Sequence, residues 1–271
     1  MAKSVNAMLV AIADAQGILA LDEPAVVPEW SAEDDRSAIT HRHLIDMSSG
    51  LDFDEDYDPM SGEFFSMIFS GDTAHYASTK SLRHQPGEQW YYASSDSNLA
   101  ARALQMSLEK HGSSIQKFAY ENLFAPIGIR SAVLEVDAAG TFVGSSYVYA
   151  TALDWLRLGQ LVLQNGRWGS AQILPESYIA ELDTPLPSSG GRYRNSIWLN
   201  RGDPQDMRFS GFPIDTRSFN GYWGQYVVVV PSKNLVMVRL GQTAGDPETV
   251  VAVMRDLYRR IGPAPEFSES R

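Results

Sequence analysis

The order in which helical and strand patterns follow one another is the feature that most restricts the fold of this chain. In the first two thirds of its 271 residues, apolar residues recur at helical spacing over 1–18, 94–110, 115–124 and 152–164. The last third changes to short β-branched or aromatic runs between turn residues, and a helix over about 247–261 ends the pattern. Helices first and antiparallel strands later predict an α+β domain rather than alternating β-α units.

Four runs are predicted as strands, and one segment as a hairpin turn. The strands are IWLN, MRFSGF, QYVVVV and LVMVRLG, and Pro231–Asn234 connects the last two. Nearer the N-terminus, HRHLIDMSSG is predicted to be a short helix closed by Gly50, and 51–62 is acidic and irregular. The 1–18 helix carries mostly alanine opposite its larger apolar side chains, which predicts that it is enclosed on several sides.

Composition excludes several functions. The hydrophobic content of 44% and the charged content of 20% are typical of a globular protein, and we expect residues 1–262 to form one domain and 263–271 a disordered tail. The net charge of −11 argues against binding to nucleic acid or to an anionic membrane, and no apolar run is long enough to span a bilayer. The absence of cysteine excludes disulfides and thiolate chemistry.

Lys3 is an unusual residue for the start of a largely apolar helix. A lysine is seldom placed there unless it is paired or its pKa is lowered. Residues three apart on a helix are neighbours, so a serine three positions before Lys3 would lie beside its amine, and that position falls immediately before Met1. Ser4 cannot substitute, because an adjacent residue points about 100° away around the helix. The alternative is that Lys3 lies at a frayed end and extends into water.

Two further segments are candidates for chemistry. In PGEQWYYASSD, a turn leads through aromatic residues to serines that can cap a helix, and Tyr92 precedes this helix start, where a phenolate costs less. Tyr92 is therefore a candidate base, or alternatively a buried tyrosine that packs a loop. In 220–225, glycines before QYVVVV allow a ligand to approach backbone N–H groups that would stabilise an oxyanion. The alternative there is a turn with two packed aromatic residues.

In combination, these segments resemble a known family. HLIDMSSGL, PGEQWYYAS, FAPIGI, VGSSYVYATALDWLRLGQLVLQNGRWGSAQILPESYI and GYWGQYVVVVPSKNLVMVRLG follow the Lys3 helix in the order seen in class C β-lactamase-like serine hydrolases of the penicillin-recognising family. The chain looks most similar to the esterase and 6-aminohexanoate-dimer hydrolase branch, over Met1 to about Ile261. The resemblance implies a β-lactamase/transpeptidase-like fold, with an antiparallel sheet, flanking helices and a largely helical lobe.

The resemblance also implies roles for individual residues. Lys3 matches the motif lysine that activates the nucleophilic serine, and Tyr92 the tyrosine that relays a proton to the leaving group. Ser94 occupies the third position of the Y-x-N/S element. The K-T-G position is occupied by Tyr222, Trp223 and Gly224, and the amide of Gln225 would be an oxyanion donor. The implied chemistry is hydrolysis of a small-molecule ester or amide through an acyl-enzyme, without a metal or other cofactor.

Two departures from the family pattern affect these expectations. Tyr222 replaces the K-T-G lysine that grips the carboxylate of β-lactams and D-Ala-D-Ala peptides, which favours hydrolysis of esters or amides. The family places a helix, two strands and the serine before the lysine, so we expect a chain truncated just after its nucleophile and inactive by itself. The alternative is a non-catalytic binding or vestigial fragment.

The expected truncation has two consequences. Any export signal would lie upstream of Met1. The absent strands would leave the LVMVRLG edge of the sheet open to self-association.

Other polar clusters are not predicted to bind metals. Acidic residues in 52–63 fall at EF-hand-like spacing, but Tyr57 occupies the position that requires glycine, which favours a solvated acidic rim. The histidines show no metal-ligand spacing; they are His41, His43, His75, His84 and His111. We also find no glycine-rich phosphate loop and no basic, aromatic stripe typical of nucleic-acid binding.

Overall fold

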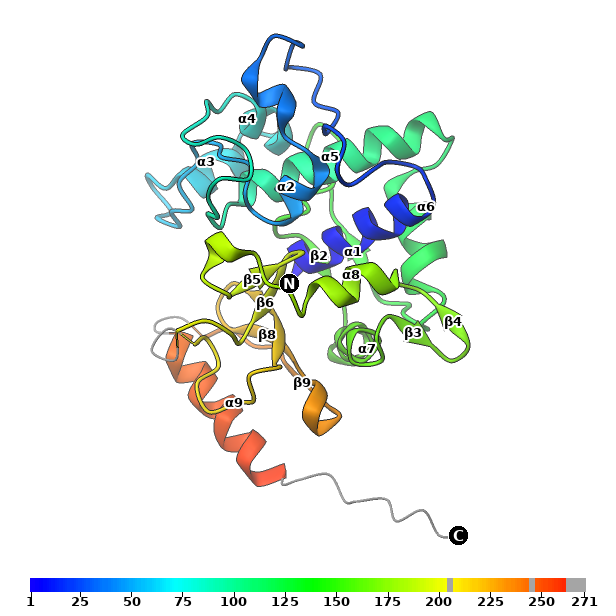
Figure 1. Ribbon diagram of the computed structural model, residues 1–271, viewed down its shortest axis with the longest axis vertical. Coiled ribbons are helices and arrows are strands. Elements are labelled where there is room, and N and C mark those ends of the chain that lie inside the picture. Colours follow the sequence, from blue (N-terminus) through cyan, green and yellow to red (C-terminus); the bar gives the residue numbers. More distant parts are fainter. Residues whose placement is uncertain (204–206, 244–246, 262–271) are drawn as a thin grey trace.

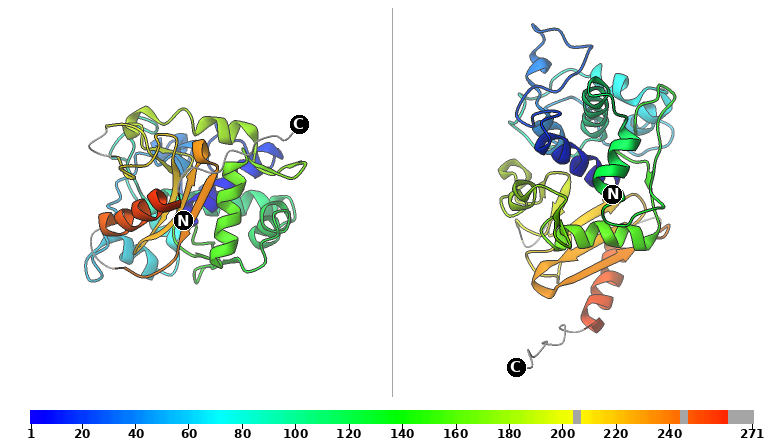
Figure 2. Two further views of the ribbon diagram at one scale, coloured as in Figure 1. Left: turned by 90° about the horizontal axis from the view of Figure 1, so that it is seen from below. Right: turned by 90° about the vertical axis from the view of Figure 1, so that its right-hand side faces the viewer.

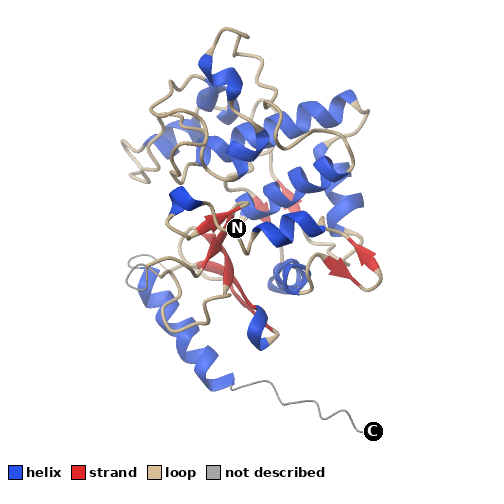
Figure 3. Cartoon of the chain, in the orientation of Figure 1, coloured by secondary structure: helices blue, strands red, loops and turns tan. Residues whose placement is uncertain are grey.

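A computed structural model describes residues 1–203, 207–243 and 247–261, and it has the predicted α+β architecture (Figure 1). Helices make up most of one part of the molecule, and the strands gather in another (Figure 3). The helices are α1 (Ala2–Ala15), α2 (His41–Ile45), α3 (Glu63–Phe69), α4 (Thr73–Ser78), α5 (Ser94–Lys110), α6 (Ile115–Ala119), α7 (Ala152–Leu163), α8 (Glu176–Glu181) and α9 (Pro247–Ile261).

The main sheet has the antiparallel order β5-β6-β7-β8-β9. Its strands are β5 (Tyr193–Arg194), β6 (Ile197–Leu199), β7 (Arg217–Gly221), β8 (Gln225–Val230) and β9 (Leu235–Arg239). Two small hairpins are formed by β1 (Val133–Leu134) with β2 (Val148–Tyr149) and by β3 (Arg167–Trp168) with β4 (Ala171–Gln172). The predicted turn at Pro231–Asn234 joins β8 to β9, and Asn234 has the left-handed φ of 47° that tight turns use.

Helices α7 and α9 cover opposite faces of this sheet (Figure 2). Successive side chains of a strand point to opposite faces of the sheet, so β8 packs against both helices. Val227 and Val229 join the core that includes α7, whereas Val228 and Val230 join a second cluster with α9. Because both faces are covered, β8 is apolar almost throughout rather than alternating with polar residues.

The first helix lies at the centre of the fold. Every residue of α1 from Ala2 to Ile12 is at most 6% exposed, which confirms the predicted enclosure. Its polar side chains are bonded to neighbouring elements: Asn6 Nδ2 donates to the carbonyl of Ser97 (2.9 Å), and Ser4 Oγ to that of Ser196 (2.7 Å). Figure 1 places the N-terminus at the junction between the helical part and the sheet. The start of α1 is therefore fixed against the sheet and is not frayed.

Some element predictions were wrong. The run MRFSGF is not a strand; Phe209 and Phe212 lie in turns, where Asn200 exchanges hydrogen bonds with the backbone of Phe209 (3.0 Å each) and both rings pack under α9. The actual strand is β7, directly after these turns. The helix predicted to reach Gly50 ends at Ile45, and α3, α4 and α8 were not predicted. The predicted tail, 263–271, lies outside the described residues.

Candidate active site

Lys3 is brought to the end of the sheet by the first turn of α1. The backbone nitrogen of Met1 donates to the carbonyl of Asn220 at 2.6 Å, at the end of β7. A Cβ atom on Gly221 would lie 3.4 Å from Met1 Cγ, so the start of the helix and the β7–β8 turn are in contact. The first turn of α1 is therefore held at the β7–β8 turn.

The side chain of Lys3 is buried among polar groups. Its Nζ donates to Ser94 Oγ at 2.7 Å, lies 3.5 Å from the carbonyl oxygen of Ser145 and is 4.6 Å from the centre of the Tyr92 ring. The fourth neighbour is Glu55, whose Oε1 is 3.6 Å from Nζ. The alternative in which Lys3 extends into water is therefore wrong.

Glu55 is the counter-ion of Lys3 and was not predicted from the sequence. Its Oε2 accepts the backbone N–H of Ser94 (2.6 Å), and its Oε1 accepts both the Ser94 hydroxyl (2.6 Å) and the Tyr57 hydroxyl (2.5 Å). Ser94 is the first residue of α5, and no side chain of the preceding residue caps this helix. The carboxylate of Glu55 therefore takes the place of an N-cap, where the helix dipole favours a negative charge.

The burial of this cluster has opposing effects on its pKa values. Burial disfavours the ammonium form of Lys3, but Tyr92 and Glu55 together outweigh it and raise the pKa of Lys3 above its ordinary value. Burial and the nearby Glu55 carboxylate raise the pKa of Tyr57 well above its ordinary value. At neutral pH, Lys3 is therefore charged and Tyr57 is a neutral donor.

The turn between β7 and β8 forms the opposite wall. Trp223 and Gly224 have positive φ values of 57° and 84°, which turn the chain sharply before β8. Arg239 fixes this turn, because its Nη1 donates to the carbonyl of Gly224 at 2.5 Å. The exposed ring of Tyr222 stacks on Trp223 (4.9 Å between centres) and on Tyr57 (5.3 Å). This wall therefore presents aromatic surface and strand-end backbone.

A cavity of about 400 Å³ lies between these groups. Four of the predicted residues line it: Lys3, Tyr92, Tyr222 and Gln225. Its lining also includes Tyr57, Ser145, Tyr149 and Trp155, which were not predicted. A second cavity of about 350 Å³ adjoins the first one across Tyr57, Tyr92 and Tyr222, and its lining includes Trp223 and Gly224. Ser94 contacts Lys3 from behind the first cavity. The predicted residues are thus brought together around neighbouring cavities.

The acidic segment is a solvated rim with one exception. Asp52, Asp54, Asp56 and Asp58 are exposed, whereas Leu51, Phe53, Glu55 and Tyr57 are turned inward. This alternation is the signal that would have found Glu55 and Tyr57, because they share a face with two apolar residues. In the part of the chain that the structure describes, no three His, Asp or Glu side chains form a group that could hold a metal ion.

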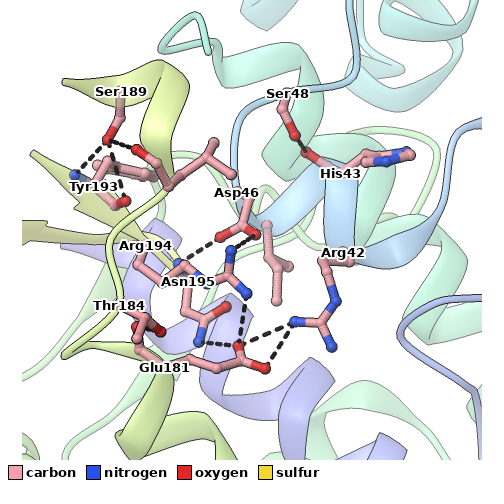
Figure 4. A network of polar contacts seen from close by, with 12 residues as sticks. Arg42, His43, Asp46, Ser48, Glu181, Thr184, Ser189, Tyr193, Arg194 and Asn195 are labelled. Atoms are coloured by element: carbon pink, nitrogen blue, oxygen red, sulfur yellow. Dashed lines mark hydrogen bonds and ion pairs between the residues drawn. The ribbon is translucent and has the colours of Figure 1, made fainter. Parts of the chain in front are cut away.

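A second polar network joins α2, α8 and the β5–β6 turn (Figure 4). Buried Asp46, after α2, accepts the backbone N–H of Asn195 (2.8 Å) and pairs with Arg194 (3.2 Å). Glu181 of α8 bonds to Asn195 (2.9 Å) and pairs with Arg42 (3.0 Å). The network fixes the β5–β6 turn. The carbonyl of Ser196 in this turn accepts the hydroxyl of Ser4, which is adjacent to Lys3 in the sequence.

Comparison with solved structures defines the class of protein. The fold is similar to that of a protein from Bacillus anthracis assigned as a 6-aminohexanoate-dimer hydrolase (TM-score 0.79, 18% identity, 98% of this chain and 72% of that chain). It is also similar to a β-lactamase from Mycobacterium bovis (0.66, 17%, 97% and 85%) and to a family VIII carboxylesterase (0.66, 14%, 95% and 81%). These matches establish a β-lactamase/transpeptidase-like fold.

The family assignment rests on the sequence. Residues 1–258 match the profile of the beta-lactamase family, and the chain belongs to this family. A comparison with curated proteins gives no significant match. Among the described residues, no helix is long and apolar enough to cross a membrane.

Proposed function

We propose that this site hydrolyses ester or amide bonds of small molecules through an acyl-enzyme. The observation that carries the proposal is the buried Lys3 amine, which lies in a cavity beside Tyr92 and within one helical turn of the position before Met1. Membership of a family of serine hydrolases supports this chemistry. The replacement of the K-T-G lysine by Tyr222 favours a substrate that is neutral at that point.

The proposed nucleophile is a serine that directly precedes Met1. Three residues separate that position from Lys3, so its hydroxyl would lie on the same helix face as the Lys3 amine. In the proposed reaction, the Lys3–Tyr92 pair activates the serine, whose proton leaves as its oxygen attacks the carbonyl carbon. Backbone amides near Gln225 would hold the oxyanion, and water would then hydrolyse the acyl-enzyme. The 271 residues by themselves contain no serine at this position, and we expect them to be inactive.

Extending the protein by a serine immediately before Met1 tests this proposal. With a 4-nitrophenyl ester, we expect a burst of 4-nitrophenol followed by steady turnover, and a loss of about a thousandfold in rate for Lys3→Ala in the extended protein. Alanine in place of the added serine is the matched control. If the serine and alanine forms release 4-nitrophenol equally, or if Lys3→Ala changes nothing, the hydrolase proposal fails and a binding role becomes the better explanation.

We also propose that the protein associates with itself through β9. This strand is at one end of the sheet order and pairs only with β8 among the described strands. An unpaired strand edge is a template for pairing with another chain. A penicillin-binding protein homologue from Pyrococcus abyssi with a similar fold (TM-score 0.65, 17% identity) is octameric.

A further inference from the structure

Glu55 is a buried acid whose carboxylate is held by several hydrogen bonds and by one cation. Its side chain is 8% exposed, yet it accepts three hydrogen bonds from Ser94 and Tyr57. A buried carboxylate keeps its charge only when donors and a cation compensate for lost hydration. Here the cation is Lys3, whose side chain is 7% exposed. Each charge is thus maintained by the other.

Ser94 fixes the geometry between the two charges. Its hydroxyl donates its single hydrogen to Glu55 at 2.6 Å, and it therefore accepts from Lys3 at 2.7 Å. The same carboxylate holds the Tyr57 hydroxyl, so Tyr57 is not a base for the cavity that it lines. These contacts direct the Lys3 amine toward the face of the Tyr92 ring.

The groups around Lys3 determine its charge. The ionisable groups that interact with it are Glu55, Tyr92 and the amino group of Met1, and Asp96 interacts with Glu55. Without Glu55, burial would favour the neutral amine of Lys3. With Glu55 at 3.6 Å, the ammonium is retained.

We propose that Glu55 is a positioning residue that keeps Lys3 as an ammonium ion beside Tyr92, so that Lys3 acts in the site as a fixed positive charge. The catalytic part of this inference rests on the proposed function. A retained proton means that Lys3 acts in the hydrolysis through its charge and does not itself take the proton of the nucleophile.

Titration of Lys3 in the 271-residue protein tests the inference without any turnover. Lysine labelled with ¹³C at Cε reports the charge of each amine, and loss of one signal in Lys3→Ala identifies Lys3. In the unmodified protein we expect a midpoint above the ordinary lysine value of about 10.4. In Glu55→Gln the midpoint should fall by at least about two pH units, a change of about a hundredfold in the fraction of neutral amine.

Glu63→Gln is the matched control, because Glu63 lies just beyond the same acidic segment and pairs with Lys80 instead. It should leave the Lys3 midpoint unchanged. Ser94→Ala removes the bridging hydroxyl but retains the carboxylate, and its Lys3 midpoint should stay well above that of Glu55→Gln. This variant and the unmodified protein decide the question even if Glu55→Gln does not fold.

Three results would overturn the inference. One is a Lys3 midpoint below the ordinary value in the unmodified protein. Another is equal midpoints in Glu55→Gln and Glu63→Gln. The third is a fall in Ser94→Ala as large as that in Glu55→Gln, which would make the hydroxyl the controlling group. Because the titration needs no nucleophile, a failure of ester hydrolysis would leave this result intact, and the two proposals can fail separately.

Discussion

Lys3 has a charged side chain in a position where hydration is almost absent. An isolated buried ammonium costs several kcal/mol, and the pairing with Glu55 and contact with Tyr92 offset that cost. Removing only one partner of such a pair leaves an uncompensated charge. The residues of this cluster therefore depend on one another, and single substitutions will not report additive contributions.

Asp96 is a second buried acid near this cluster, in the first turn of α5. Burial raises the pKa of Asp96 to about 7, although hydrogen bonds from Ser49 oppose the shift, and the nearby Glu55 adds to it. In the unfolded chain, the Asp96 carboxyl has its ordinary pKa of 3.8 and has lost its proton at pH 5. In the folded protein, the same carboxyl still holds its proton at this pH. This stabilisation is present in full below about pH 4 and is lost as the pH rises to about 7.

We predict that Asp96→Asn makes the stability of the protein less dependent on pH. Between pH 5 and pH 8, the Asp96 carboxyl should account for a loss of about 3 kcal/mol in the free energy of unfolding, from about two pH units at 1.36 kcal/mol each. Because asparagine does not titrate, Asp96→Asn should not lose this free energy of unfolding. Urea denaturation at both pH values measures it in each protein. Parallel pH dependences in the two proteins would show that Asp96 does not titrate in this range.

Among the elements, α7 packs closely against the sheet at Gly159. A Cβ atom on Gly159 would lie 2.6 Å from Val236 Cγ1 and 2.7 Å from Val227 Cγ1, so only glycine allows this distance between helix and sheet. Both valines are β-branched and stiff, and they belong to strands paired in register, so they cannot move apart easily. The packing of α7 against the sheet therefore requires a residue without a side chain at position 159.

We predict that Gly159→Ala destabilises the protein by about 1–3 kcal/mol through overpacking, even though alanine favours a helix by about 1 kcal/mol. Leu153→Ala is the control on the same helix, because Leu153 is 68% exposed, and it should change stability by less than about 0.5 kcal/mol. Thermal and urea unfolding measure both changes. Equal stability of Gly159→Ala and the unmodified protein would show that the sheet and α7 adjust freely.

Elements with a strong internal pattern were predictable from the sequence. The helix over 94–110 and the final helix over 247–261 agree with the structure, because their apolar periodicity is local. MRFSGF failed because its aromatic residues are held by Asn200 and by α9, which no local pattern reveals. Lys3 and Tyr92 stood out by their positions at helix starts. Glu55 did not, because Lys3 and Ser94 are far away in the sequence, and only the alternation of buried and exposed residues in its segment marks it as turned inward.

At the scale of the whole molecule, the two edges of the sheet differ. The edge at β5 is short, and the polar network around Arg194 and Asn195 fixes it. The edge at β9 extends over Leu235–Arg239, and α7 covers its face but leaves its outer backbone groups without a neighbouring strand in the described sheet. Natural proteins blunt such edges with charges, prolines or bulges, and this strand is mostly apolar.

We predict that the protein forms dimers or larger assemblies through β9 as its concentration rises. Sedimentation velocity over a range from about 1 to 100 μM measures the change, and hydrogen exchange should show protection of the β9 amides in the associated form. A single monomeric species at the highest concentration would contradict this prediction.

The central claim is that a hydroxyl placed directly before Met1 reacts with an acyl group in the cavity of Lys3 and Tyr92. The most direct test is the intact mass of the serine-extended protein after brief exposure to a slowly hydrolysed ester or a fluorophosphonate, followed by mapping of the modified residue. We expect one adduct per chain, on the added serine, and its loss when that residue is alanine. Labelling of both forms to the same extent, or of neither form, would contradict it.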